Sequence, residues 1–233
     1  MIVENGQKRR LTVPELLFYL ILSIILNSFA NGLAVASNLG SAVWTSSAVN
    51  LHSILPGSLG TILFVYAIIV QLVNLLIRQH LDVRAVSANL LFAFLFSYLV
   101  QFWTHILVIL TIPHFNIIIR LLLNILSICG ISIATSIYQR LDVMLHPNDE
   151  FSYLIRFKFV HGSAAWAQCL SYLIPVAIII ICLFKTHRLL AVNIGTFFAL
   201  FFQGSIIGWA DLHVFSKLKH RLFLKAKTPT SSH

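Results

Sequence analysis

The polar side chains that could do chemistry in this sequence lie mostly within long apolar segments. The candidates for binding a small polar solute are Asn27, Asn31, Asn38, Trp44, His105, Arg120 and Asn124. An amide offers both donors and an acceptor, and at membrane depth it is costly unless it meets a partner or a wet cavity. These residues therefore predict either a polar site inside an apolar protein or hydrogen bonds between its helices.

Several candidates also have a purely structural interpretation. Arg120 is the one strong cation expected inside an apolar span, where an ionisable residue is commonly functional. Its long side chain could equally reach water near the end of that span. His105 could relay protons or hydrogen-bond a neighbouring helix, and Trp44 could cap a pocket or anchor the chain at the membrane interface.

The sequence contains no arrangement typical of an enzyme. It has no Ser-His-Asp set, no metal-spaced His/Cys cluster and no glycine-lysine phosphate loop. Cys129, Cys169 and Cys182 lie in apolar segments without metal-ligand spacing, and we interpret them as packing residues. We predict no enzymatic activity, no cofactor and no metal site.

The composition predicts an integral membrane protein. Of the 233 residues, 58% are hydrophobic and only 10% are charged, whereas soluble domains are roughly one quarter charged. The formal net charge of +9 does not indicate nucleic-acid binding, because the basic residues lie between apolar runs instead of covering one face. The lipid bilayer is the expected partner.

Hydropathy predicts an all-α fold with six transmembrane helices. The expected spans cover residues 14–37, 58–77, 85–110, 117–139, 163–184 and 189–209, each about long enough to cross a bilayer. Two connections are unusual: 38–54 is polar but uncharged, and 140–162 is amphipathic. Each of them is expected either to re-enter the membrane or to lie on its surface.

Small residues recur every four positions along the first span. They are Ser28, Gly32, Ala36 and Gly40. On a helix this spacing gives one smooth stripe that another helix can approach closely. We predict that the stripe is a helix-packing face.

The basic residues indicate the orientation of the chain. With both termini in the cytoplasm, thirteen of the sixteen Lys and Arg residues lie inside, and only Arg120, Lys185 and Arg188 lie outside. A five-span alternative would bring the turn at 185–188 inside but would export a basic terminus. The predicted organisation is a cytoplasmic leader (1–11), two three-helix halves (12–112 and 113–211) and a basic cytoplasmic tail (212–233).

An internal repeat relates the two halves. GLAVASNL at 32–39 resembles GISIATSI at 130–137, and AVSANLLFAFLF at 85–96 resembles AVNIGTFFALFF at 191–202. Because three spans is an odd number, the second copy would enter the membrane from the opposite side. This predicts a 3+3 inverted-topology repeat, as in many secondary transporters, with chance matches between apolar strings as the alternative. In such a repeat, Asn124 occupies a position related to those of Asn27 and Asn31, so the three amides could face one another across the pseudo-symmetric centre.

Short motifs resemble a known group of membrane proteins. The pattern G-L-A-V-x-S-x-L-G-S-x-x-W at 32–44, S-L-G-T at 58–61, H-P-N-D at 146–149 and N-I-G-T-F-F-A-L at 193–200 are similar to signatures of the YitT/YczE group of bacterial inner-membrane proteins. That group usually has Ser-Pro-Trp-Asp where this chain has Ala42-Val43-Trp44-Thr45. The resemblance implies a five- or six-span protein of the bacterial plasma membrane, described as a permease without an established substrate.

These observations favour a small transporter for an unidentified polar or anionic solute, with its site at mid-membrane between the two repeats. One alternative is a substrate-capture subunit that docks onto an energising partner subunit through the small-residue stripe. Another is a membrane scaffold without transport activity, and a homo-oligomer is also compatible with the sequence.

Overall fold

The computed structural model describes residues 2–4 and 7–220 of the chain. Two short strands, β1 (Ile2–Glu4) and β2 (Gln7–Arg9), form an antiparallel hairpin near the N-terminus. The helices that follow are α1 (Val13–Ala36), α2 (Val43–His52), α3 (Leu59–Arg78), α4 (Val83–Ile109), η1 (Ile112–His114), α5 (Ile117–Leu141), α6 (Pro147–Lys158), α7 (Ala164–Ser171), α8 (Leu173–Thr186) and α9 (Ile194–His213). Apart from the hairpin, the regular structure in the described residues is helical, as predicted.

Five helical segments in the described part of the chain are long and apolar enough to cross a membrane. They are α1, α3, α4, α5 and the segment formed by α7 and α8 together, with mean hydropathies between 1.7 and 2.3. The protein is therefore a multi-pass membrane protein. The sixth predicted span corresponds to α9, which is as long as α3 but is not one of the five, because Gln203, Asp211 and His213 interrupt its apolar residues.

Polar caps fix where most of the long helices begin. Side chains of Ser58, Asp82, Asn116 and Asn193 accept hydrogen bonds from backbone N–H groups at the starts of α3, α4, α5 and α9. Such caps satisfy donors that a helix start leaves unpaired. The short helix α2 differs, because its cap residue is Ala42 and no side chain accepts from its first turn.

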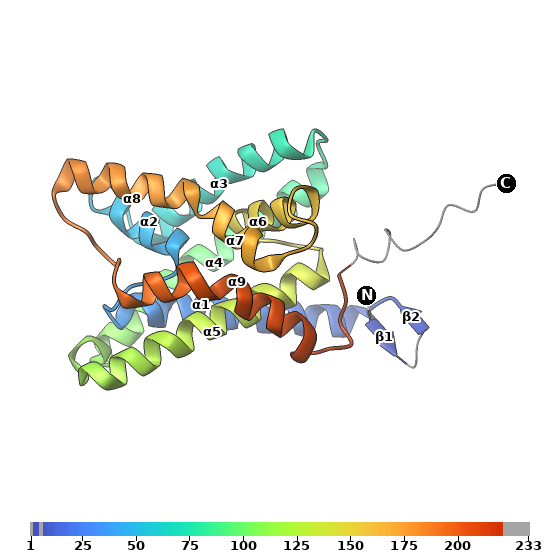
Figure 1. Cartoon of the computed structure of the whole chain (residues 1–233), viewed down its shortest axis with the longest axis horizontal. Helices are drawn as coiled ribbons and strands as arrows, with labels where there is room; N and C mark the ends of the chain where they lie inside the picture. Colours follow the sequence, from blue (N-terminus) through green and yellow to red (C-terminus); the bar gives the residue numbers. More distant parts are fainter. Residues whose placement is uncertain (1, 5–6, 221–233) are drawn as a thin grey trace.

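The long helices are arranged around a central pair. Helices α1 and α5 pack side by side, with α4 against α1 and α9 against α5. Figure 1 shows that α1 and α5 run in opposite directions, as do α4 and α9. Each helix of the central pair therefore also packs against one further long helix from its own half of the chain.

Two short helices join the halves. Helix α2 packs against α8 of the second half, and α6 packs against α3 of the first half. Helix α6 is mostly buried within the protein, although its sequence is amphipathic. Two of its charged residues are buried and have partners from other elements: Glu150 lies 2.5 Å from Arg78, and Arg156 lies 2.8 Å from Asp211.

Apolar side chains cover both the interior and much of the surface. The main buried cluster contains aromatic residues from several helices, including Trp44, Tyr66, Phe92 and Tyr138. The long helices also expose large apolar side chains; Phe184, for example, is 75% exposed. A soluble monomer rarely shows so much exposed apolar surface, so these residues form the expected contact with lipid.

Candidate solute-binding cavity

A small cavity lies where α1, α2, α5, α6 and α9 meet. Its polar lining consists of Asn27, Asn31, Trp44, Thr45, His146, Asn148, Asp149 and Gln203. Apolar residues from α3, α4 and α5, including Leu63, Phe96 and Ile131, complete the wall. The cavity has a volume of about 30 Å³ for the centres of water molecules, so it has room for about two waters.

A continuous chain of hydrogen bonds forms the α1 wall of the cavity. Thr45 Oγ1 donates to Asn31 Oδ1 over 2.6 Å, and Asn31 Nδ2 donates to Asn27 Oδ1 over 2.9 Å. Asn27 Nδ2 in turn donates to the hydroxyl of Tyr138 over 3.3 Å. These amides are largely committed to one another, so this wall is held rigidly in place.

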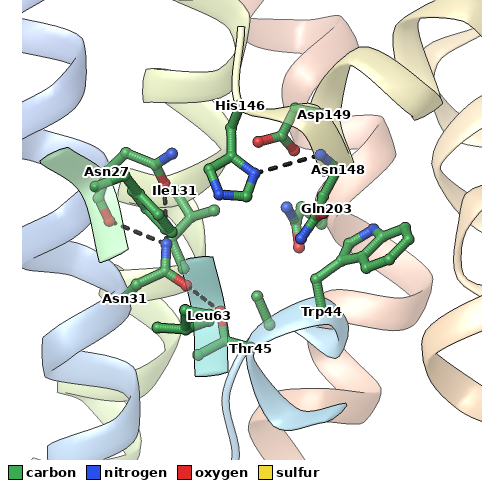
Figure 2. Close-up of a pocket in the computed structure, with 12 residues that line it drawn as sticks. Asn27, Asn31, Trp44, Thr45, Leu63, Ile131, His146, Asn148, Asp149 and Gln203 are labelled. Carbon is green, nitrogen blue, oxygen red and sulfur yellow. Dashed lines mark hydrogen bonds between the residues drawn. The ribbon is translucent and has the colours of Figure 1, made fainter. Parts of the chain in front are cut away.

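The α6 wall presents groups that lack partners. His146 caps α6, and its Nδ1 accepts from the backbone N–H of Asn148 over 3.3 Å. In a neutral imidazole the proton then lies on Nε2, and this atom has no hydrogen-bond partner. Asn148 Oδ1 is also buried without a partner. In Figure 2, the His146 ring points into the central space between Asn27 and Asn31 on one side and Gln203 and Asn148 on the other.

Asp149 brings a carboxylate to the edge of this space. The Tyr138 hydroxyl donates a short hydrogen bond to Asp149 Oδ2. Because Tyr138 also accepts from Asn27, the carboxylate is linked through α5 to the amide chain of α1. Among the described residues that line the cavity, none is a lysine or arginine that could neutralise it.

The α2 wall resembles the α6 wall in its position but not in its chemistry. The first turn of α2 contributes Trp44 and Thr45 to the lining, as the first turn of α6 contributes Asn148 and Asp149. The indole N–H of Trp44 is buried without a partner, while its ring packs against Tyr66. The starts of two short helices therefore converge on one cavity from opposite halves of the chain.

A second polar cluster lies at the end of α9, apart from the cavity. Asp211 accepts from Ser136 at 2.7 Å and from Arg156 at 2.8 Å, and it lies 3.0 Å from Nε2 of His220. Arg140 approaches the same carboxylate to 3.6 Å. Burial lowers the pKa of His220, although Asp211 acts in the opposite direction. These contacts tie the C-terminal segment to α5 and α6.

The structure brings together three of the seven candidate residues from the sequence. Asn27, Asn31 and Trp44 line the cavity. Asn124 does not face Asn27 and Asn31 as its place in the repeat suggested, because its amide donates to Ser37 Oγ at 2.8 Å and to the Gly40 carbonyl at 2.6 Å. Since α1 and α5 are antiparallel, the start of α5 lies beside the end of α1, away from the middle of that helix.

The remaining three candidates also lie outside the cavity. Arg120 donates from Nε to the Ser37 carbonyl at 2.8 Å and from Nη2 to the Asn38 carbonyl at 3.2 Å. It thus holds the C-terminal end of α1, a structural role that suits a cation near the negative end of a helix. Asn38 is exposed with a positive φ of 53°, and His105 is exposed on α4.

The small-residue stripe packs within the chain itself. A Cβ added at Gly32 would lie 2.7 Å from Cβ of Trp103 on α4, so only glycine permits this approach. Gly40 has a φ of +100° and lies against the backbone of Thr196. Ser28 and Ala36 are also buried, so the stripe does not form a free surface.

Sequence reasoning missed five polar residues of the cavity. They are Thr45, His146, Asn148, Asp149 and Gln203. One available signal was Pro147 directly after His146, since proline favours the first position of a helix and so placed His146 at its cap. The long-range contacts that bury this helix start had no local signal.

Comparisons with known proteins give one family. Residues 14–211, most of the chain, match the model of a family of unknown function, DUF6198. Searches of curated proteins and of solved structures give no significant match. Among the described residues, no group of three or more His, Cys, Asp or Glu residues could hold a metal ion.

Proposed function

The chain belongs to the DUF6198 family, and we propose that it is a small membrane transporter for a polar or anionic solute that binds in the central cavity. The observation that carries this proposal is the convergence of the first turns of α2 and α6 on one polar cavity among long apolar helices. Broken or half-length helices that meet near the bilayer centre are how many secondary transporters build their sites.

The packing of the two halves supports an inverted repeat. Helices α1 to α4 correspond in order to α5, α6, α7 with α8, and α9. The pairs α1 with α4 and α5 with α9 match, as do the exchanged pairs α6 with α3 and α2 with α8. Opposite chain directions in Figure 1 fit the same relation. In this arrangement α9 is the sixth span, and both termini lie in the cytoplasm of a bacterial cell.

Uptake into liposomes tests the proposed site. The full chain is reconstituted and offered a panel of radiolabelled small anions, neutral amides and amines, with protein-free liposomes as the blank. Trp44→Phe removes the unpartnered indole N–H but keeps an aromatic ring, so we expect at least a tenfold loss of uptake with little change in folding. Trp166→Phe is the matched control, because Trp166 is 67% exposed and does not line the cavity. Equal uptake by the two variants would reject this site.

The capture-subunit alternative loses its proposed docking face. The stripe of Ser28, Gly32, Ala36 and Gly40 is buried by other parts of the same chain, so a partner subunit would have to bind elsewhere. A scaffold without transport activity would show no uptake of any member of the panel.

A further inference from the structure

Unpaired hydrogen-bond donors gather at the α2 side of the cavity. The backbone N–H groups of Val43, Trp44 and Thr45 make no hydrogen bond within the described part of the chain, because Ala42 has no polar side chain to cap them. All three residues are at least 94% buried. A buried helix start with free N–H groups and a positive dipole end is a favourable place for an anion.

Two side chains add donors to the same space. Trp44 Nε1 carries an N–H, and His146 Nε2 carries one when Nδ1 accepts from Asn148, yet neither atom has a partner. The exposed fractions of Trp44 and His146 are only 6% and 2%. Leaving buried donors unsatisfied costs free energy, so the cavity is prepared for a ligand that accepts hydrogen bonds. Asn148 can turn either end of its amide toward such a ligand.

The carboxyl group of Asp149 opposes an anion unless it carries a proton. Its Oδ2 accepts from Tyr138, and no basic side chain among the described lining residues balances its charge. Two negative charges in a space for about two waters would repel strongly at low dielectric. Protonation of Asp149 removes this repulsion, so binding of the anion and of the proton are coupled.

We propose that the cavity binds a small monovalent anion of two or three non-hydrogen atoms together with one proton, which Asp149 carries. This inference rests on the proposed transport function and adds its solute class and coupling ion. Asp149 is a positioning and proton-carrying residue, while Trp44, His146 and the start of α2 hold the anion.

Of the groups around Asp149, Asp149 itself is the one that we assign as the proton carrier. Tyr138 faces it from α5, and Tyr172 lies within electrostatic reach between α7 and α8. Glu150 on the same helix is paired with Arg78 of α3. Helix α4 contributes Phe92 and Phe96 beside His146, neither of which titrates.

Formate, formamide and methylammonium are suitable probes because they are similar in size but differ in charge. Binding is measured on the purified full-length protein by isothermal titration calorimetry between pH 5.5 and 8, where formate stays ionised. For the wild type we expect formate alone to bind, with an affinity that falls up to tenfold per pH unit as Asp149 loses its proton. Asp149→Asn should bind formate with no pH dependence, and Trp44→Phe should bind about tenfold more weakly.

Four outcomes would overturn the inference: no formate binding, equal or better binding of formamide or methylammonium, an affinity that rises with pH, or a wild-type pH slope in Asp149→Asn. Trp166→Phe should match the wild type, and Trp44→Phe provides a readout should Asp149→Asn fail to fold. Flux in liposomes separates the two proposals. Formate binding without flux supports the inference and refutes transport, whereas uptake of formamide alone supports transport and refutes the inference.

Discussion

Buried charges in this protein are paired with residues from distant parts of the chain. Asp211 on α9 faces Arg140 and Arg156, and the side chains of all three are less than a tenth exposed. Asp211→Asn leaves two buried guanidinium groups without a counter-charge, and removing one partner of a buried ion pair typically costs about 3–5 kcal/mol. We expect a large fall in melting temperature of the detergent-solubilised protein, measured by dye-free fluorescence scanning.

Asp82→Asn is the matched control for Asp211→Asn. Asp82 caps α4 from an exposed position, and asparagine caps a helix about as well as aspartate. The melting temperature should therefore change little. A fall of equal size in both variants would show that the Asp211 cluster contributes no special stability.

Substitution of Arg120 should change the stability of the protein and not its affinity for solute, which is the opposite of what a solute-binding cation would show. Its hydrogen bonds to the carbonyls of Ser37 and Asn38 place it at the end of α1, outside the cavity. Arg120→Met should lower stability by about 1 kcal/mol and leave solute affinity unchanged. Arg120→Lys should recover part of the stability, since one donor can still reach a carbonyl. Loss of solute binding in a stably folded Arg120→Met variant would contradict this role.

At the scale of elements, α1 and α4 approach each other closely at Gly32. A Cβ there would lie 2.7 Å from Cβ of Trp103 and 3.0 Å from a backbone nitrogen, so the helices must separate. We expect Gly32→Ala to destabilise the protein by about 1–3 kcal/mol. Gly208→Ala is the control, because its Cβ would meet only an ordinary contact at 3.8 Å; it should be neutral or stabilise by up to about 1 kcal/mol. Thermal stability in detergent distinguishes the two.

Some features of the helices could be predicted from local sequence patterns, and others could not. Apolar length predicted the membrane-crossing segments, and the four-residue spacing of small residues predicted that one face of α1 packs closely. Neither signal could identify α4 as the partner, because contacts between distant helices leave no local periodicity. The amphipathic sequence of α6 predicted a segment that re-enters the membrane or lies on its surface. The burial of Glu150 could not be predicted locally, because its partner Arg78 is far away in the chain.

The cavity was harder to predict than the helices. Asn27 and Asn31 were found because amides within an apolar span are rare and costly. Asn124 was grouped with them from the repeat, but antiparallel packing sets it beside Ser37. His146 and Asn148 lie in a polar connection that composition alone cannot distinguish from a solvated loop.

At the scale of the whole molecule, the number of spans decides whether the two halves are inverted. The turns after α3 and after α8 lie on opposite sides because three spans separate them, and if α9 also crosses the membrane, the segments before α1 and after α9 lie on the same side. Single cysteines test this in a variant without Cys129, Cys169 and Cys182. Four exposed positions suit the purpose: Arg10→Cys, His80→Cys, His187→Cys and Ser216→Cys.

A membrane-impermeant maleimide applied to intact cells should label only His187→Cys, and the other three should react after permeabilisation. We expect this because basic residues favour the cytoplasmic side, and they are concentrated at the termini and in the α3–α4 turn. Labelling of Ser216→Cys in intact cells, with Arg10→Cys protected, would mean that α9 does not cross. The halves would then contain three and two spans and could not be complete inverted copies of each other, although α2 and α6, separated by the three spans α3, α4 and α5, would still approach the cavity from opposite sides of the membrane.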